Sequence, residues 1–371
     1  MIGFWVSVLL LAYHYVAYPL ILQLLPIRPA APPPDPVDWP RISVLLSAYD
    51  EASHIRGRIE NLLALDYPSD RLEVWVGVDG ACDGTEAIAR TVADRRVRVV
   101  AFPARRGKLA ILNDLARRAT GDVLVLTDAN VLFADDAVRR LARHFSTPSV
   151  GAVCGRLAFV GDPETSEHRY WDHETLLKER ESRIDSCLGT NGAIAAFRAA
   201  CWPRLADDTL VEDFVLAMRV REGGFKVVFD QTAVALEDLP TTVRQEMGRR
   251  ARIGAGAYQA LGLCWRSLLP WRGRYVWCYW SHKVLRWLSP FLLLMALGTN
   301  LALLDLPLYR ILLGGQVAFY ALAALGAVGR SRPFRLPHYF VALHLALLLG
   351  FWRFVTRTQP AAWVRTARSV A

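Results

Sequence analysis

Long apolar stretches lie near both ends of the chain, with shorter mixed segments between them. Residues 1–27 contain no Asp, Glu, Lys or Arg, and three similar stretches follow at 287–304, 311–329 and 336–352. An apolar helix of about 20 residues crosses the hydrocarbon core of a bilayer. We therefore predict an uncleaved transmembrane helix over residues 1–27 and a C-terminal transmembrane region of two or three spans over residues 287–355.

Three other segments have compositions of their own. Residues 28–40 (RPAAPPPDPVDWP) are rich in proline, which predicts a stiff linker. Residues 263–286 mix tryptophan, tyrosine and arginine, which predicts an amphipathic segment in the membrane interface. Residues 356–371 form a basic tail.

The basic tail raises a question about the number of crossings. Four spans place both termini on one side of the membrane and the middle of the chain on the other. Arginines in and just before the tail then lie outside, against the positive-inside rule. Either the last apolar stretch re-enters without crossing, or the rule fails in this protein. The arginines concerned are Arg353, Arg357, Arg365 and Arg368.

Residues 41–262 have the pattern of an α/β domain. Short runs rich in β-formers (ISVLLS, EVWVGV, VRVVAF, DVLVLT, VGAVCG) alternate with amphipathic stretches such as 54–65 and 108–119. This alternation predicts a mixed, mostly parallel sheet with helices on both faces. Substrates of such sheets bind outside the carboxyl ends of the strands, where polar residues gather here.

Composition and charge narrow the class of protein. The 371 residues are 53% hydrophobic, and the net charge is +9. Because many of the cations stand beside the apolar stretches, they fit the positive-inside rule better than a nucleic-acid surface, and we expect no nucleic-acid partner. The six cysteines show no zinc-ligand spacing and are expected to be reduced thiols of a cytosolic domain.

Several short motifs follow the predicted strands in order. They are SAYDE at 47–51, VDGACDGT at 78–85, RGK at 106–108 with Asn113, TDAN at 127–130, GTNGA at 189–193, VED at 211–213 and QEMGRRARI at 245–253. Taken together, they resemble family 2 glycosyltransferases. These are inverting enzymes of the GT-A fold, and they include the synthases of cellulose, hyaluronan and poly-N-acetylglucosamine. The resemblance covers residues 41–260, and the C-terminal apolar stretches suit the membrane branch of the family.

The resemblance implies a site for a nucleotide-sugar donor. A basic helix on anionic lipid explains the arginines of the last motif equally well, and a plain Asp-Gly turn explains the motif at 78–85. The implied donor-binding residues are Ser47, Tyr49, Glu51, Asp79, Asp83, Lys108, Asp128, Arg250 and Arg252.

The resemblance also implies a metal site and a base. Asp128 and Asn130 stand where the family binds Mg²⁺ or Mn²⁺, which prefer oxygen ligands. Asp213 corresponds to the general base that deprotonates the acceptor hydroxyl. The implied acceptor-binding residues are Asn191, Gly192 and Glu212.

Four positions depart from the family pattern. Asp50 replaces an asparagine, and Val78 replaces the first aspartate of a pair. Asn130 carries less charge than the usual aspartate, so metal affinity is expected to be lower. Ile253 stands where a tryptophan stacks on the acceptor sugar, which weakens the case for an acceptor channel like that of cellulose or hyaluronan synthase.

The leading hypothesis is a membrane-bound inverting glycosyltransferase with a cytosolic catalytic domain. It transfers a sugar from a UDP-sugar to a glycan acceptor in polysaccharide synthesis. One alternative is transfer of a single sugar to a lipid, either ceramide-like or a polyprenyl phosphate. A second alternative is a membrane protein that binds a nucleotide sugar without catalysis. The presence of Asp128 together with Asp213 counts against the latter, because a binding module needs no base.

Overall fold

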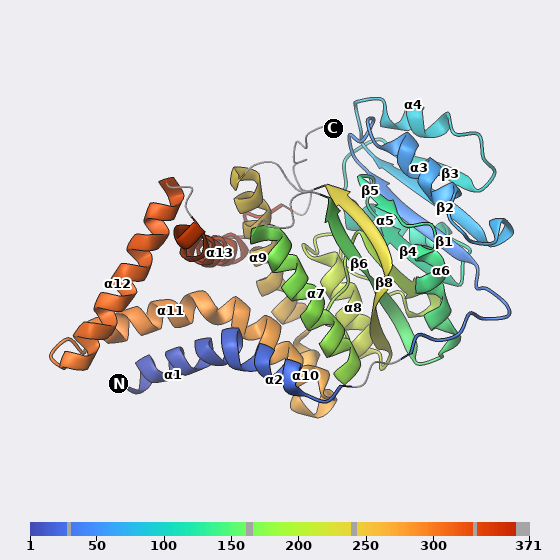
Figure 1. Ribbon diagram of the computed structural model, residues 1–371. Helices are drawn as coiled ribbons and strands as arrows, with labels where there is room; N and C mark the ends of the chain where they lie inside the picture. The colour runs from blue at the N-terminus through green and yellow to red at the C-terminus, as the bar shows by residue number, and fades with distance from the viewer. Residues whose placement is uncertain (28–30, 161–165, 239–242, 329–331, 361–371) are drawn as a thin grey trace.

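The computed structural model describes residues 1–27, 31–160, 166–238, 243–328 and 332–360, which form an α/β domain joined on one side to long apolar helices (Figure 1). One eight-stranded sheet, in the order β3-β2-β1-β4-β7-β6-β8-β5, forms the centre of the domain. The strands are β1 (Ile42–Ala48), β2 (Leu72–Asp79), β3 (Val97–Phe102), β4 (Val123–Thr127), β5 (Val131–Phe133), β6 (Val150–Val160), β7 (Ile194–Arg198) and β8 (Lys226–Asp238).

The sheet is mixed and mostly parallel, as the sequence predicts. Strands β3, β2, β1 and β4 run parallel to one another, and β6 runs parallel to β8. Only β7 and β5 pair antiparallel with their neighbours. Ile42 in β1 lies opposite both Leu72 in β2 and Val123 in β4, so these three strands end at the same edge of the sheet.

Helices cover both faces of the sheet. Consecutive strand residues point to opposite faces, and both kinds are therefore buried. Val44 and Leu46 of β1 pack into one core, and Leu45 packs into the other. The first core is covered by α3 (Ile55–Leu63), α4 (Thr85–Arg90) and α6 (Ala137–Ala142), and the second by α5 (Lys108–Arg118), α8 (Glu212–Glu222) and α9 (Val243–Leu263). Another helix, α7 (Ser166–Ile184), lies between the sheet and the apolar helices (Figure 1).

Within the described parts of the chain, four helical runs are long and apolar enough to cross a membrane: Ile2–Leu24, Tyr275–Leu301, Pro307–Ala327 and Phe334–Val355. Their elements are α1 (Ile2–Ala12), the π-helical segment η1 (Tyr13–Ala17), α2 (Tyr18–Leu24), α10 (Tyr275–Cys278), the π-helical segment η7 (Tyr279–Val284), α11 (Leu285–Leu301), α12 (Pro307–Val328) and α13 (Arg332–Val355).

The interface segment predicted over 263–286 is divided in the structure. Residues 265–272 form two short 3-10 turns, but residues 275–286 belong to the helical run that continues through α11. The sequence set the start of this span at 287 because Lys283 and Arg286 are charged. In the fold both cations form ion pairs with Glu174 of α7, and the helix continues through them.

The domain and the apolar helices share one core. Tyr275, Tyr279 and Trp287 belong to the same buried cluster as Leu126 of β4 and Met218 of α8. The packing is therefore continuous across the boundary predicted at residue 262, and the α/β domain and the apolar helices share one core.

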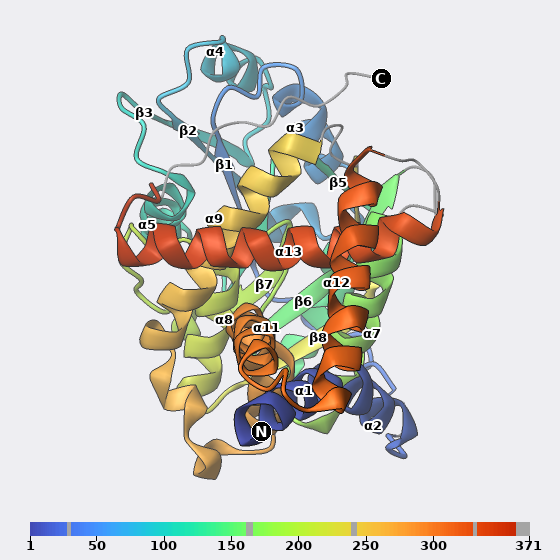
Figure 2. The same ribbon diagram turned by 90° about the vertical axis from the view of Figure 1, so that its left-hand side faces the viewer.

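The last apolar helix does not run parallel to the first ones. The run α1–α2 lies beside α11, whereas α13 lies across this direction and packs on α9 (Figures 1 and 2). The two helices approach closely at glycine, since a Cβ on Gly350 would lie 2.6 Å from the backbone nitrogen of Ala255.

Candidate active site

A small pocket of about 80 Å³, partly open to solvent, lies at the edge of the sheet where β1, β2 and β4 end. Of the donor-site and metal-site residues that the sequence predicts, all but Asp83, Arg250 and Arg252 line it. The lining residues are Ser47, Tyr49, Glu51, Asp79, Arg105, Gly107, Lys108, Asp128, Ala129 and Asn130.

Asp79 connects the end of β2 to the loop before α5. Its carboxylate accepts hydrogen bonds from the backbone nitrogens of Arg106 at 2.6 Å and Gly107 at 2.8 Å. Its side chain is almost fully buried. Gly80 permits this close approach, because its φ is +64° and a Cβ there would lie 2.6 Å from the nitrogen of Arg105. Asp79 therefore organises the loop that carries Lys108, in addition to lining the pocket.

The loop after β1 is tied to the loop after β2 by two aspartates. Asp50 adopts φ +53°, a conformation that Asn and Asp tolerate best among side-chain-bearing residues, and accepts a hydrogen bond from the Cys82 nitrogen at 3.0 Å. Asp83 accepts from the nitrogens of Ala52 and Thr85, each at 3.0 Å. Asp83 thus lies behind the pocket wall, where it holds the two loops together.

Lys108 links the pocket to the start of α8. Its ammonium lies 2.6 Å from the Asp128 carboxylate and 3.4 Å from that of Glu212. Burial alone would lower the pKa of Lys108, but Asp128, Glu212 and Asp213 offset this effect and raise it. The lysine therefore stays protonated and holds carboxylates of two different elements together.

Asp213 is fixed in the first turn of α8. One carboxylate oxygen accepts from the Phe214 nitrogen at 2.8 Å, and the other from the Gly192 nitrogen at 3.3 Å. Burial and the neighbouring Glu212 raise the pKa of Asp213, while Lys108 opposes the increase. A carboxylate held by backbone N–H groups with a raised pKa has the properties of a general base.

The loop at 189–193 lies against Asp213. The hydroxyl of Thr190 donates to the Asp213 carbonyl at 2.8 Å. The amide nitrogen of Asn191 donates to the Gly155 carbonyl at 2.8 Å. The structure thus brings the predicted acceptor residues Asn191, Gly192 and Glu212 to one place beside the predicted base.

The predicted diphosphate clamp is not brought to the pocket lining. The Arg250 guanidinium donates to the Tyr339 hydroxyl of α13 at 2.8 Å, and the Arg252 guanidinium donates to the Leu210 carbonyl at 2.8 Å. These contacts tie α9 to α13 and to the segment before α8. Binding of the diphosphate by these arginines stays a prediction.

The oxygen donors for a cation are few. Asp128 and Asn130 both line the pocket, and the Asn130 amide nitrogen donates to Glu237 at 3.1 Å. Among the described residues, no group of three His, Cys, Asp or Glu side chains is placed to hold a metal ion. A cation here would take one carboxylate from the protein and its other ligands from a bound diphosphate and water.

Two residues near the site were missed by the sequence reasoning. Arg105 lines the pocket, with its guanidinium carbon 3.7 Å from the centre of the Tyr49 ring. Its position beside the RGK motif was the available signal. Lys178 of α7 donates to the Asn191 side-chain oxygen. No motif marks it, because it is distant in sequence from every residue of the pocket.

The fold and the site together have the arrangement of a GT-A glycosyltransferase. The model of glycosyl transferase family 2 matches residues 43–204 of this chain. The mannosyltransferase PcManGT from Pyrobaculum calidifontis, solved with GDP-Man and Mn²⁺, superposes with a TM-score of 0.75 at 25% identity. The match covers 95% of this chain and 99% of that one.

Curated relatives agree with the family. Beta-monoglucosyldiacylglycerol synthase of Synechocystis sp. is 26% identical over 66% of this chain. Poly-beta-1,6-N-acetyl-D-glucosamine synthase of Staphylococcus epidermidis is 23% identical over 59% of this chain. The aligned region spans 55% of the length of each of these two relatives.

Proposed function

We propose that this protein transfers a sugar, with inversion, from a UDP-sugar to a hydroxyl group of a glycan in polysaccharide synthesis. The observation that carries the proposal is the position of Lys108. Its ammonium joins Asp128 in the donor pocket to Glu212, the residue next to Asp213. This geometry supports donor binding and proton abstraction one lysine side chain apart, as a single displacement requires.

The chemistry follows from the two carboxylates. Asp213 takes the proton of the acceptor hydroxyl as its oxygen attacks the anomeric carbon. The bond from that carbon to the nucleoside diphosphate breaks on the opposite face, which inverts the configuration. Lys108 and the backbone N–H groups before α5 supply fixed positive potential at the pocket.

A divalent cation fits the donor set of the pocket. Asp128 would hold it, with Asn130 as a weaker neighbour, and the bound cation would neutralise charge that develops on the leaving diphosphate. One carboxylate plus phosphate oxygens is a usual arrangement for Mg²⁺ at nucleotide sites. Lys108 would then exchange part of its contact with Asp128 for the diphosphate.

The relatives named as N-acetylglucosaminyltransferases and poly-N-acetylglucosamine synthases support a glycan acceptor. Transfer of one sugar to a membrane lipid is a second candidate, favoured by the position of the base. Phe214, the residue after Asp213, has its ring 5.8 Å from that of Tyr279 and 5.5 Å from that of Trp287, both in a membrane helix. An acceptor hydroxyl presented from the membrane reaches the base along this side.

We further propose that the catalytic domain lies in the cytosol. Helix α12 leads from the far end of α11 back toward α9, and α13 then lies across the other helices beside the domain (Figure 2). Three crossings put the domain and the basic tail on the same side of the membrane. That arrangement obeys the positive-inside rule, which four crossings would violate.

Calorimetry of the full-length protein in detergent tests donor binding. UDP is titrated in Mn²⁺ and then in EDTA, with GDP as the alternative nucleotide. We expect binding of UDP that requires Mn²⁺ and is lost in Asp128→Ala. Tighter binding of GDP than of UDP would indicate that the donor is a GDP-sugar. Binding of neither nucleotide would overturn the enzymatic proposal.

Product analysis separates the two acceptors. Radiolabelled UDP-GlcNAc and UDP-glucose are supplied with an N-acetylglucosamine tetramer or with dioleoylglycerol vesicles. Lengthened oligosaccharide supports the glycan acceptor. One sugar per lipid molecule, with no oligosaccharide product, would assign the protein to the second candidate.

A further inference from the structure

Helix α7 carries three buried charged residues on one face. Glu174, Lys178 and Glu181 are spaced by four and three residues, so they share one side of the helix. Their exposed fractions are 5%, 8% and 0%. Such residues are almost never fully buried unless they are paired, so each needs a partner in the surrounding fold.

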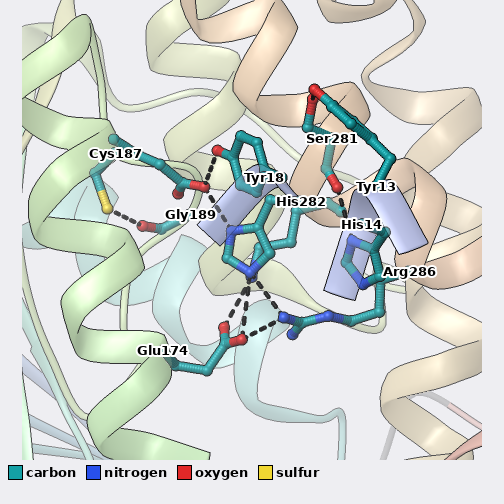
Figure 3. Close-up of polar contacts among 11 residues, drawn as sticks. Tyr13, His14, Tyr18, Glu174, Cys187, Gly189, Ser281, His282 and Arg286 are labelled. Carbon is teal, nitrogen blue, oxygen red and sulfur yellow. Dashed lines mark hydrogen bonds and ion pairs between the residues drawn. The ribbon is translucent and has the colours of Figure 1, made fainter. Parts of the chain in front are cut away.

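The two glutamates bind the membrane helices (Figure 3). Glu181 accepts from the Tyr18 hydroxyl at 2.7 Å and from His282 Nδ1 at 2.6 Å. Glu174 forms ion pairs with Arg286 at 2.5 Å and Lys283 at 3.1 Å. Tyr18 lies in α2, and the three other partners lie in η7 and α11.

The network holds two carboxylates, Glu174 and Glu181, together with two fixed cations, Lys283 and Arg286. His282 lies between the carboxylates, with Nδ1 2.6 Å from Glu181 and Nε2 3.2 Å from Glu174. Removing one partner of such a buried set is expensive, so the network fixes α7 against the membrane helices.

Lys178 lies between the two glutamates and faces the acceptor loop instead. Its ammonium donates to the Asn191 side-chain oxygen and, within the described residues, makes no ion pair with a carboxylate. The next residue, Gly192, donates its nitrogen to Asp213 at 3.3 Å. The Lys178 ammonium on α7 is thereby connected through Asn191 and Gly192 to the predicted base, Asp213.

We infer that Lys178 is a positioning residue for the acceptor half of the reaction, held in place by the network that joins α7 to the membrane helices. The inference rests on the proposed function, in which Asp213 is the base. Removing the ammonium leaves the Asn191 oxygen without this donor and takes away one of the bonds that hold the loop beside Asp213. The donor pocket keeps all of its lining residues, because Lys178 is not among them.

The pH profile gives a readout that loosened packing alone does not move. Burial and Glu212 raise the pKa of Asp213, and Lys108 and Lys178 lower it. Loss of Lys178 removes one lowering influence, so the pKa of the base rises further. Because the base acts when deprotonated, the acid limb of the rate profile must move to higher pH.

The test compares Lys178→Met, Lys178→Arg and the matched control Lys226→Met, whose side chain is exposed on β8. Full-length proteins are assayed with UDP-GlcNAc or UDP-glucose, using the N-acetylglucosamine tetramer and dioleoylglycerol vesicles as acceptor probes. Calorimetry with UDP and Mn²⁺ reports on the donor site.

For Lys178→Met we expect kcat/KM for the acceptor to fall about tenfold or more, with UDP affinity unchanged. The acid limb should move to higher pH, and Lys178→Arg should restore most of the rate. Acceptor kinetics equal to those of Lys226→Met would overturn the inference. So would parallel losses of UDP affinity and rate with an unmoved acid limb, which indicate general loosening. No transfer by the wild-type protein would instead overturn the proposed function itself.

Discussion

Asp79→Asn tests whether the end of β2 organises the donor loop. The side chain is 2% exposed, and each carboxylate oxygen accepts one backbone N–H, from Arg106 and Gly107. Asparagine has the same shape but offers one oxygen and one NH₂ group. One backbone N–H therefore keeps an acceptor, now uncharged, while the other faces a donor.

The magnitude follows from these two bonds. A hydrogen bond to a charged group contributes about 1.5–3 kcal/mol, and a buried donor left unpaired costs about 1–3 kcal/mol. We expect a local loss of about 2–4 kcal/mol in the variant. If about 2 kcal/mol of this is needed to re-order the loop when nucleotide binds, the Kd for UDP rises about 30-fold.

Thermal unfolding and calorimetry with UDP measure the two effects on full-length protein in one detergent. The control is Asp122→Asn, whose carboxylate also accepts a backbone N–H, from Arg41 at 3.0 Å, but is 57% exposed. The control should stay within about 0.5 kcal/mol of wild type. An unchanged unfolding midpoint with weakened UDP binding would mean that Asp79 acts by touching the nucleotide alone. Unchanged values of both would refute the reasoning.

Three further predictions concern the site. Asp213→Asn should abolish transfer while leaving UDP affinity intact, and normal turnover of the variant would show that Asp213 is not the base. In the wild type, activity should fall as the pH drops through the raised pKa of Asp213, so the acid limb of the pH profile lies above the usual range of an aspartate. Asp128→Ala should lose Mn²⁺-dependent UDP binding in calorimetry, and retained dependence would place the metal elsewhere. Arg250→Ala should weaken UDP binding about tenfold or more if the guanidinium also binds the diphosphate. Wild-type affinity would leave Arg250 with a structural role through its bond to Tyr339.

The donor half of the site was predictable because each of its motifs is local. Ser47, Asp79 and Asp128 lie at or directly after the ends of buried strands. Parallel strands that start together in register also end together, so strand-end residues converge wherever the sheet forms. The alternating pattern of the sequence was enough to predict that sheet.

The motifs of the proposed acceptor half were predictable, but the residues that hold them in place were not. Asp213 and Asn191 stood in recognisable sequences, whereas Lys178 and Glu174 belong to no motif. Their partners lie far away in the chain, with His282 separated from Glu174 by 108 residues. Only packing of the helices identifies such pairs, because no local pattern encodes them.

The membrane boundaries show the same division. By itself the sequence determined that apolar helices flank an α/β domain, because hydrophobic length and strand periodicity are properties of contiguous residues. Only the tertiary structure decided that one span continues through Lys283 and Arg286, and that α13 lies across the others. The cost of burying a charge depends on which distant residues pair with it. The direction of a helix depends on which distant elements pack against it.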